Sequence, residues 1–225
     1  MILKQEIAKV KSAKTIWAED FSKPKLKWEL VDDEDEHAWM EDGVYNMKNL
    51  TESHWHFYAL GSGLDFKNDD YFINTHFTFN VDFGSEFSSV GLVFGFKKYF
   101  KRLNRFVVDT SLQRAVIADF WREDSQPINR RSVRLDKKKY DGHLSRENYC
   151  TMGILKVGNR ISFFINNFKT PVFETDLDFF NFDGDRLGFF VEPCVELRAS
   201  LIHVRKLETE IVNELNIGEL SELFI

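Results

Sequence analysis

The sequence predicts an all-β protein: a two-sheet antiparallel jelly-roll sandwich with a short helix at each end. Three observations support this fold class. The chain has 225 residues, of which 23 are Phe and 15% are aromatic, and aromatic side chains suit the half-buried surface of a sheet. Short apolar runs separated by turn residues fill the chain from about residue 15 to residue 206. No helical periods lie between these runs, which favours a sandwich or barrel over an α/β fold.

The segment 72–83 carries the clearest strand pattern. Ile, Thr, Phe, Phe, Val and Phe occupy the odd positions from Ile73 to Phe83, and Asn, His, Thr, Asn and Asp occupy the even positions between them. A helix would spread these aromatic side chains around its circumference, whereas a strand places them on one face. The pattern predicts a strand with its odd residues in the core.

Other runs predict further strands in the same way. The run 91–96 is apolar on both faces, which is typical of a central strand covered on both sides, and 106–109 and 115–121 are expected to pair. Further strands are expected at 54–58, 159–167, 187–191 and 195–206, with turns at 156–159, 166–167 and 183–185. In 159–167 the alternation places Ile161, Phe163 and Ile165 inward and Arg160, Ser162, Phe164 and Asn166 outward.

The two ends of the chain show helical rather than alternating spacing. Residues 2–13 space Ile2, Leu3, Ile7 and Val10 as one face of a short amphipathic helix. Residues 207–225 carry an apolar stripe on an acidic segment. We therefore divide the chain into an N-terminal helix at 1–14, a sandwich at 15–206 and a helical tail at 207–225. The tail either packs back on the sandwich or docks on a partner, because its last residues stay apolar.

Charge and composition exclude several classes of protein. The net charge is −6, so no strong positive field exists to attract nucleic acid, and we expect no nucleic-acid partner. No apolar stretch approaches the roughly 20 residues that span a bilayer, so no membrane insertion is expected. Cys150 and Cys194 are too few for a disulfide scaffold and favour reduced thiols in the cytoplasm. The N-terminus lacks the pattern of a signal peptide, although a removed signal would make the protein an exported one.

The chain from about Trp17 to Lys206 resembles the concanavalin A-like lectin and glucanase superfamily, in particular its bacterial laminin-G-like and glucanase-like domains. The resembling segments are, in order, Trp17-Ala-Glu-Asp-Phe-Ser with Trp28, Asp42-Gly-Val-Tyr, Asp65-Phe with 72–83, 90–96, 158–167 and 185–191. The resemblance implies two antiparallel sheets, one convex and one concave, with a ligand held on the concave face or at its rim. It does not fix the function, because unrelated activities share such folds.

The carboxylate pattern of the glucanases is absent. Retaining glycosidases place two carboxylates roughly 5 Å apart, and glucanases of the resembling superfamily carry them as Glu-x-Asp-x-(x)-Glu on one strand. The nearest match, Glu174-Thr-Asp176-Leu-Asp178, lacks the final Glu, and the acidic run 32–36 is typical of a solvated loop. We therefore expect a non-enzymatic recognition module. The alternatives are a glycan hydrolase with non-standard residues such as Asp119 or Glu174, and a structural subunit of a larger secretion or defence assembly.

Two clusters of aspartates suggest a metal only weakly. Asp65, Asp69 and Asp70 lie near one turn, and Asp183 and Asp185 flank Gly184. Calcium accepts carboxylate and carbonyl oxygens from such loops, but a plain turn is the favoured interpretation of both clusters. We expect no cofactor, with calcium as the one ion that the sequence leaves open.

A carbohydrate is the ligand class that the sequence supports best, and a protein partner is the alternative. Sugar sites combine an aromatic platform for the apolar face of the ring with planar polar side chains for its hydroxyls. The strand 54–58 is expected to bury Trp55 and Phe57 and to expose three polar residues. The candidate ligand-binding residues are His54, His56, Tyr58, Asp119, Trp121, Arg160, Ser162 and Asn166. The competing interpretation is that Trp39, Trp55 and Trp121 fill the core.

Overall fold

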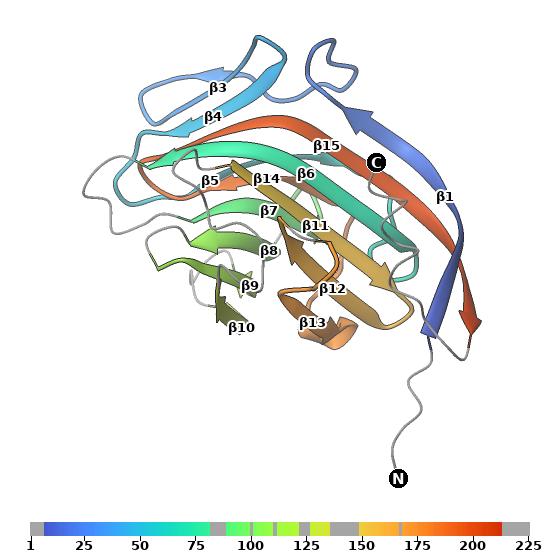
Figure 1. The fold of residues 1–225 in the computed structure, drawn as a ribbon. Helices are drawn as coiled ribbons and strands as arrows, with labels where there is room; N and C mark the ends of the chain where they lie inside the picture. Colours follow the sequence, from blue (N-terminus) through green and yellow to red (C-terminus); the bar gives the residue numbers. More distant parts are fainter. Residues whose placement is uncertain are drawn as a thin grey trace.

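The computed structural model shows a sandwich of two antiparallel β-sheets (Figure 1). The structure describes residues 7–81, 89–99, 101–109, 112–121, 127–135, 149–166 and 168–212, and for 7–11, 121 and 210–212 it describes the backbone alone. Among these residues the one helical element is a short 3₁₀ turn, Leu177–Phe179. No helix in the described ranges is long and apolar enough to cross a membrane.

The larger sheet has nine strands. Its order is β13-β12-β11-β6-β15-β4-β3-β2, and β1 pairs with β15 beside this path. The strands are β1 (Ile7–Glu19), β2 (Val31–Asp32), β3 (Glu36–Glu41), β4 (Val44–Asn49), β6 (Asp70–Val81), β11 (Tyr149–Val157), β12 (Arg160–Ile165), β13 (Phe173–Asp176) and β15 (Val195–Val212). The long strands β15, β6 and β1 arch over the rest of the molecule (Figure 1).

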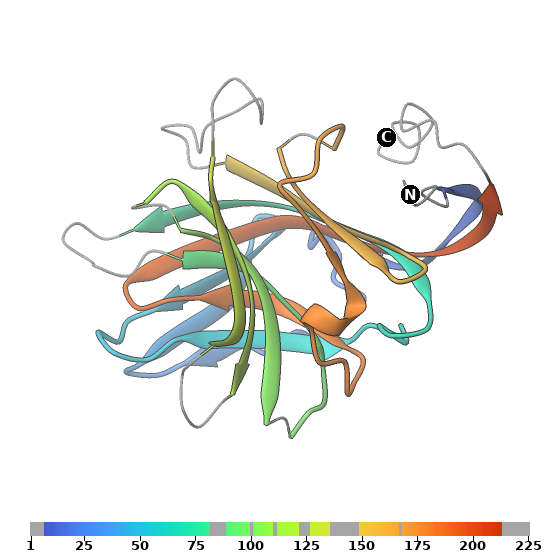
Figure 2. The same ribbon diagram turned by 90° about the horizontal axis from the view of Figure 1, so that it is seen from below.

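The smaller sheet has six strands in the order β10-β9-β8-β7-β14-β5. These are β5 (His56–Gly61), β7 (Ser89–Phe96), β8 (Arg102–Asp109), β9 (Arg114–Trp121), β10 (Pro127–Arg134) and β14 (Arg186–Val191). Figure 2 shows the outer strands of this sheet crossing the strands of the larger sheet at a steep angle. The free edge strands of the smaller sheet are therefore β10 and β5.

The main core lies between the two sheets and is rich in aromatic rings. Trp28 packs on Tyr45 and Phe189 with ring centroids 4.9 and 5.5 Å apart, which joins the two sheets near one end. Near the other end, the rings of Phe163 and Phe106 also join the two sheets, with centroids 4.9 Å apart. Such pairs add roughly 0.5–1.5 kcal/mol each beyond their burial. The high Phe content therefore fills the space between the sheets.

The smaller sheet is also apolar on its outer face. A second cluster there contains Val93, Phe96, Leu103, Val107, Val116 and Phe190, with Trp55, Phe57 and Ala59 packed against it. The prediction that 91–96 is covered on both faces is confirmed, since every residue of β7 is buried. Alternation along this sheet therefore separates two apolar faces rather than an apolar face from a polar one.

The predicted terminal helices are wrong. Residues 7–13 belong to β1, which pairs with β15 from Ile7↔Val212 to Glu19↔Ile202, and residues 207–212 belong to β15. The rest of both predicted helices, 2–6 and 213–225, lies outside the described residues. A short isolated helix is marginal in water, whereas the open edge of a long strand offers backbone partners along its whole length. The backbone pairing of β1 with β15 therefore decides the structure of these segments, although their apolar residues have helical spacing.

The strand predictions for the middle of the chain are confirmed. In β6, Ile73, Phe77 and Phe79 lie in the main core as expected, and residues 82 and 83 of the predicted strand lie outside the described residues. The strands β8 and β9 pair, with Val107 opposite Val116. The strands β11 and β12 form a hairpin around Gly158 and Asn159, with Val157 opposite Arg160. Both cysteines are free thiols, and burial raises the pKa of Cys150.

Candidate functional site

The strand β5 faces the opposite way from the prediction. Tyr58 is 6% exposed and lies in the main core, whereas Trp55 and Phe57 lie in the outer cluster of the smaller sheet. His54 is exposed in the loop before the strand, where its ring Nδ1 lies 2.8 Å from Ser53 Oγ. The predicted group of exposed His54, His56 and Tyr58 therefore does not form.

His56 instead takes part in a polar contact between the sheets. Its Nδ1 lies 2.5 Å from Oε2 of Glu36 on β3, and both side chains are about one-fifth exposed. Burial and the nearby Glu36 carboxylate raise the pKa of Tyr58 well above its usual value. The Nε2 atom of His56 and the hydroxyl of Tyr58 are buried without a hydrogen-bond partner in the described structure. This region is a polar inclusion in the core rather than an open site.

Asp119 is also an interior residue. It is fully buried on β9 and forms an ion pair with Arg102 at the start of β8. Burial raises its pKa, an effect that Arg102 opposes and the neighbouring Asp183 carboxylate reinforces. Trp121 ends the same strand, and its side chain lies outside the described part of the structure. Asp119 therefore has no open surface on which to meet a ligand.

Arg160, Ser162 and Asn166 lie on the outer side of β12 and just beyond it. Arg160 pairs with Glu174 at 3.0 Å, and the Ser162 hydroxyl donates to the same carboxylate at 3.5 Å. Asn166 accepts a hydrogen bond from the Thr151 amide at 2.8 Å. These residues belong to the larger sheet, whereas the candidates on β5 and β9 belong to the smaller one. The structure therefore does not gather the predicted ligand-binding residues into one place.

Four of the five aspartates weighed as calcium ligands are engaged in other contacts, whereas Asp183 Oδ1 is buried without a hydrogen-bond partner in the described structure. Asp65 and Asp69 accept hydrogen bonds within their own turn, and Asp70 pairs with Lys156. Asp183 is half-buried, and the exposed Asp185 accepts the Ser62 amide and hydroxyl through its backbone oxygen. Among the described residues, no three His, Cys, Asp or Glu side chains are grouped to hold a metal ion.

A hollow lies at the β2–β3 edge of the larger sheet. It has a volume of about 410 Å³ and is lined by Leu30, Val31, Asp32, His37, Ala38 and Trp39. Ala38 and Met40 pack in the core, so His37 and Trp39, on either side of Ala38, point to the outer face of the sheet. Leu30 is 61% exposed beside them. The hollow therefore combines an aromatic side chain with a histidine and a carboxylate.

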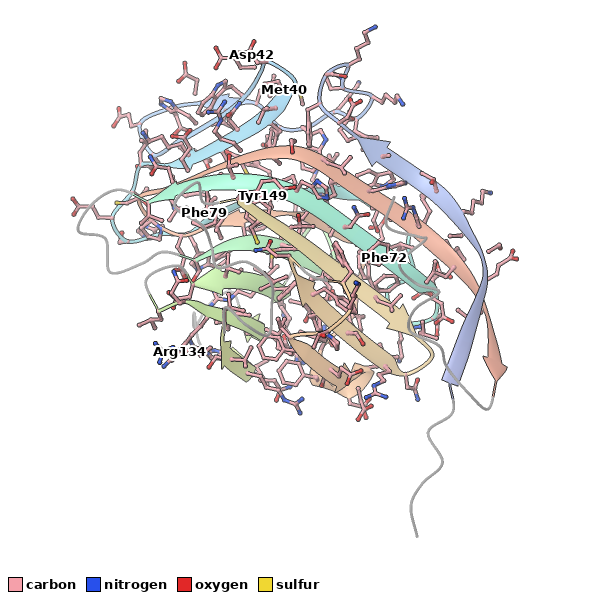
Figure 3. The ribbon with its side chains drawn as sticks, in the orientation of Figure 1. Met40, Asp42, Phe72, Phe79, Arg134 and Tyr149 are labelled. Atoms are coloured by element: carbon pink, nitrogen blue, oxygen red, sulfur yellow. The ribbon has the colours of Figure 1, made fainter. Side chains whose placement is uncertain are left out.

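Trp39 also begins a row of side chains that crosses the outer face. Trp39 is opposite Asn46 on β4, Asn46 is opposite Arg198 on β15, Arg198 is opposite Thr78 on β6, and Thr78 is opposite Tyr149 on β11. Five strands contribute, so the row spans about 19 Å at the usual strand spacing. Figure 3 labels Tyr149 at the start of β11, and Met40 marks the strand that carries Trp39. We call these five residues the outer row.

Hydrogen bonds hold the polar members of the outer row in place. Arg198 Nε donates to Asn46 Oδ1 at 3.1 Å, and Trp39 Nε1 donates to Glu41 at 3.2 Å. Tyr149 is 43% exposed, and its hydroxyl lies 3.2 Å from His76 Nδ1. Burial lowers the pKa of His76, which favours the neutral ring at this contact. Asn46 is 1% exposed, so the exposed Arg198 is the planar polar group that the outer row presents between its two aromatic side chains.

The sequence interpretation missed this surface. It considered Trp39 only as a core residue and did not single out Asn46, Arg198 or Tyr149. One signal was available, because Trp39 alternates with Ala38 and Met40 and must point away from them. The other four positions come from strands between residues 44 and 212 whose neighbours depend on the sheet order, so local patterning does not bring them together.

Comparison with known proteins identifies the fold. No protein-family profile and no curated protein sequence matches this chain. The chain is similar to a laminarinase catalytic domain from Thermotoga petrophila, with a TM-score of 0.58, 9% identity, and coverage of 88% of this chain and 99% of that one. It is similar to a carbohydrate esterase of the Shiga toxin-encoding bacteriophage phi24B, with a TM-score of 0.57, 10% identity, and coverage of 88% and 100%.

A binding module shares the same architecture. The CBM2 module of the evolved Dit protein of Lactobacillus casei phage J-1 matches with a TM-score of 0.55, 8% identity, and coverage of 89% of this chain and 98% of that one. Two carbohydrate-active enzymes and a CBM2 module therefore share the arrangement of strands. The expectation raised by the sequence segments is confirmed for the fold: this chain has the two-sheet jelly-roll arrangement of strands that these carbohydrate-binding and glucanase domains share.

Proposed function

We propose that the protein binds an extended carbohydrate chain along the outer row of the larger sheet. The observation that carries this proposal is the hollow beside Trp39, from which the row leads across five strands to the exposed Tyr149. An aromatic face packs against the apolar face of a sugar, and the exposed Arg198 guanidinium donates to its hydroxyls, whereas Asn46 is 1% exposed and holds Arg198 in position. A row of about 19 Å suits a chain of several sugar units rather than a monosaccharide.

The contacts of the row favour recognition over hydrolysis. The general acid of a glycosidase keeps its proton because its environment raises its pKa, usually by burial. The side chain of Asp32 in the hollow is 92% exposed and lies 3.4 Å from His37. The carboxylate of Glu41 accepts a hydrogen bond from Trp39. The CBM2 module of the phage Dit protein, which has the same fold, supports a binding role for such a sandwich.

A binding measurement with laminarin and other neutral glycans tests the proposal. We expect isothermal titration to detect binding that Trp39→Ala weakens by about tenfold or more, since a stacked aromatic is a dominant contact. Tyr99→Ala is the matched control, because Tyr99 is 86% exposed and lies outside the row. Tyr149→Ala is expected to weaken the binding of long chains more than that of short ones. Absence of binding to every glycan, or full binding by Trp39→Ala, would overturn the proposal.

An activity assay separates the proposal from its rival. Incubation of the protein with a bound glycan should release no new reducing ends. If reducing ends appear, and if they are lost in Asp119→Asn or Glu174→Gln, the protein is a hydrolase with non-standard catalytic residues and the recognition role is wrong.

A further inference from the structure

A cluster of arginines lies on the outer face of the smaller sheet at its β10 edge. Arg130 and Arg134 alternate with Ser132 on β10 and share its outer face, because Val133 between them packs against the main core. Arg114 on β9 lies directly opposite Arg134. All three arginines are exposed. We call Arg114, Arg130 and Arg134 the edge arginines. Figure 3 labels Arg134 at the free edge of the smaller sheet.

The arrangement brings like charges together. Directly opposed residues on one face of a sheet have Cβ atoms about 5 Å apart, and like charges at that spacing repel. Asp109 lies opposite Arg114 on its other side, and its Oδ1 accepts the Leu112 amide at 3.0 Å. Arg134 is on the outermost of the described strands of this sheet, so no other described strand supplies a counter-charge on its free side.

A fourth arginine lies beside the edge arginines, further into the sheet, but it is paired with a carboxylate. Arg105 on β8 and Arg130 on β10 lie in the same cross-strand row, separated by the small Ala118. The Arg105 guanidinium lies 3.9 Å from the centroid of the Phe120 ring and 3.5 Å from Glu192, and its Nε is buried without a partner in the described structure. Burial, with a smaller effect of the nearby positive charge of Arg130, lowers the pKa of Arg105 to about 10, although the Glu192 carboxylate opposes this shift.

Within the described ranges, none of the edge arginines forms an ion pair with a carboxylate. Arg105 differs, because Glu192 neutralises it, and that carboxylate also accepts the Ser89 amide at 2.8 Å. The chain as a whole carries a net charge of −6. The β10 edge is therefore a local positive surface on an acidic protein, and its charges face solvent.

We propose that the edge arginines bind an acidic polysaccharide, one whose carboxylate or sulfate groups repeat along the chain. Arg130 and Arg134 are four residues apart on an extended strand, which separates them by about 13 Å. Arg114 and Arg134 offer two guanidinium groups at one end of this spacing, and a carboxylate or sulfate between them would relieve their repulsion. This surface is separate from the outer row, which belongs to the other sheet.

Two simpler explanations of the edge arginines do not account for all of their features. Charged side chains on an edge strand prevent pairing with another chain, but that role needs no second arginine at position 114 on the interior strand β9. Nucleic acid is the other common polyanion, but a net charge of −6 repels a uniformly charged duplex beyond the local patch. A polysaccharide with more widely spaced charges meets less of this repulsion.

The test measures binding of the full chain to sulfated dextran, to polygalacturonate and to neutral dextran by isothermal titration. We expect the two acidic polymers to bind, the neutral one not to bind, and the affinity to fall as salt rises, because exposed charges are screened within about 10 Å at 0.1 M salt. Replacement of all three edge arginines by Gln (R114Q, R130Q and R134Q together) should weaken binding by about tenfold or more. Replacement of the same three by Lys should restore part of the affinity, since Lys keeps the charge but not the planar fork.

The matched control changes three lysines outside the patch to Gln (K14Q, K23Q and K67Q together). These lysines are exposed and form no ion pair in the described structure, and the change in net charge is the same. An equal loss of binding in the control, full binding by the arginine variant, or equally tight binding of duplex DNA would overturn the proposal. Near-ultraviolet circular dichroism establishes that each variant is folded. The laminarin titration with the arginine variant keeps this outcome separate from that of the outer row, because the variant retains Trp39.

Discussion

His56 Nδ1 lies 2.5 Å from Glu36 Oε2, and this contact joins the edge strand β5 of the smaller sheet to β3 of the larger one. Both side chains are mostly buried, so removal of the charge on one leaves the other without its partner. We expect Glu36→Gln to lower the free energy of unfolding by about 1–2 kcal/mol, measured by urea denaturation. The exposed pair His37–Asp32 is the control: Asp32→Asn should cost less than about 0.5 kcal/mol. Equal losses in the two variants would contradict the linking role of His56.

The raised pKa of Asp119 predicts a specific pH dependence. Because burial raises this pKa above its ordinary value of 3.8, the folded carboxyl keeps its proton at pH values where the unfolded chain has lost it. The folded state then binds more protons, so the contribution of Asp119 to stability falls as the pH rises through the range that starts at 3.8. Asp119→Asn should remove this fall when unfolding free energies are compared across that range.

Asp33 provides the control of opposite sign. Hydrogen bonds from the Glu36 and Asp35 amides lower the pKa of this exposed carboxyl, so its contribution is present above pH 3.8 and is lost as the pH falls through its lower, folded-state pKa. Asp33→Asn should therefore change the pH profile in the other direction. If Asp119→Asn leaves the pH dependence of the free energy of unfolding unchanged, the Asp119 carboxyl has the same pKa in the folded and unfolded states, and the prediction is wrong.

Two glycines should respond very differently to substitution by alanine. A Cβ atom on Gly188 would lie 1.8 Å from the backbone oxygen of Tyr58, whereas a Cβ on Gly158 would meet nothing within 4 Å. Gly188→Ala must move β5 away from β14, and we expect a loss of about 3 kcal/mol or more, or failure to fold. Gly158→Ala should cost only about 1 kcal/mol, from its positive φ of 57°. Thermal unfolding followed by circular dichroism compares the two; a small effect at Gly188 would contradict the close pairing of β5 with β14.

Lys156 and Asp70 form a buried ion pair whose two partners are not equivalent. The Lys156 Nζ lies 3.3 Å from Asp70 Oδ1 and its side chain is 2% exposed, while Asp70 also accepts the Gly158 amide and the Thr209 hydroxyl. Asp70→Asn leaves a buried ammonium without a counter-charge and should cost about 3 kcal/mol. Lys156→Met leaves a carboxylate that still has two donors and should cost less. The half-exposed Lys206, paired with Asp69, is the control, and Lys206→Met should cost under about 1 kcal/mol.

A double-mutant cycle completes this comparison. If the ion pair is what each single change disrupts, the combined variant should lose less than the sum of the two, with a coupling of about 1 kcal/mol or more from urea unfolding. Additive losses would mean that Lys156 and Asp70 stabilise the sheet independently of each other.

Alternation along single segments was enough to predict most of the strands. The period of two in 72–83 depends only on neighbouring residues, and it correctly placed Ile73 and Phe77 in the core. The same signal failed at β5, because the smaller sheet is apolar on both faces. Alternation there distinguishes the two faces but does not say which one meets the other sheet, so Tyr58 was placed outside and Trp55 inside.

The surface that we assign to carbohydrate could not be predicted from local sequence. Trp39, Arg198 and Tyr149 become neighbours only because β15 lies between β4 and β6, and β6 lies next to β11. Such pairings between distant segments depend on the packing of the whole chain. The prediction of an N-terminal helix failed for the same reason, because the strand that pairs with this segment is β15, about 190 residues further along the chain.

The position of β15 has a consequence for how the chain folds during synthesis. It is the last strand that the structure describes, yet it separates β6 from β4 and so joins the two parts of the larger sheet. Until it emerges from the ribosome, the apolar edge of β6 has no native partner on that side, and β1 has none at all. Exposed edges of this kind invite pairing with other chains. A protein shortened before residue 195 should therefore aggregate rather than form a smaller sandwich.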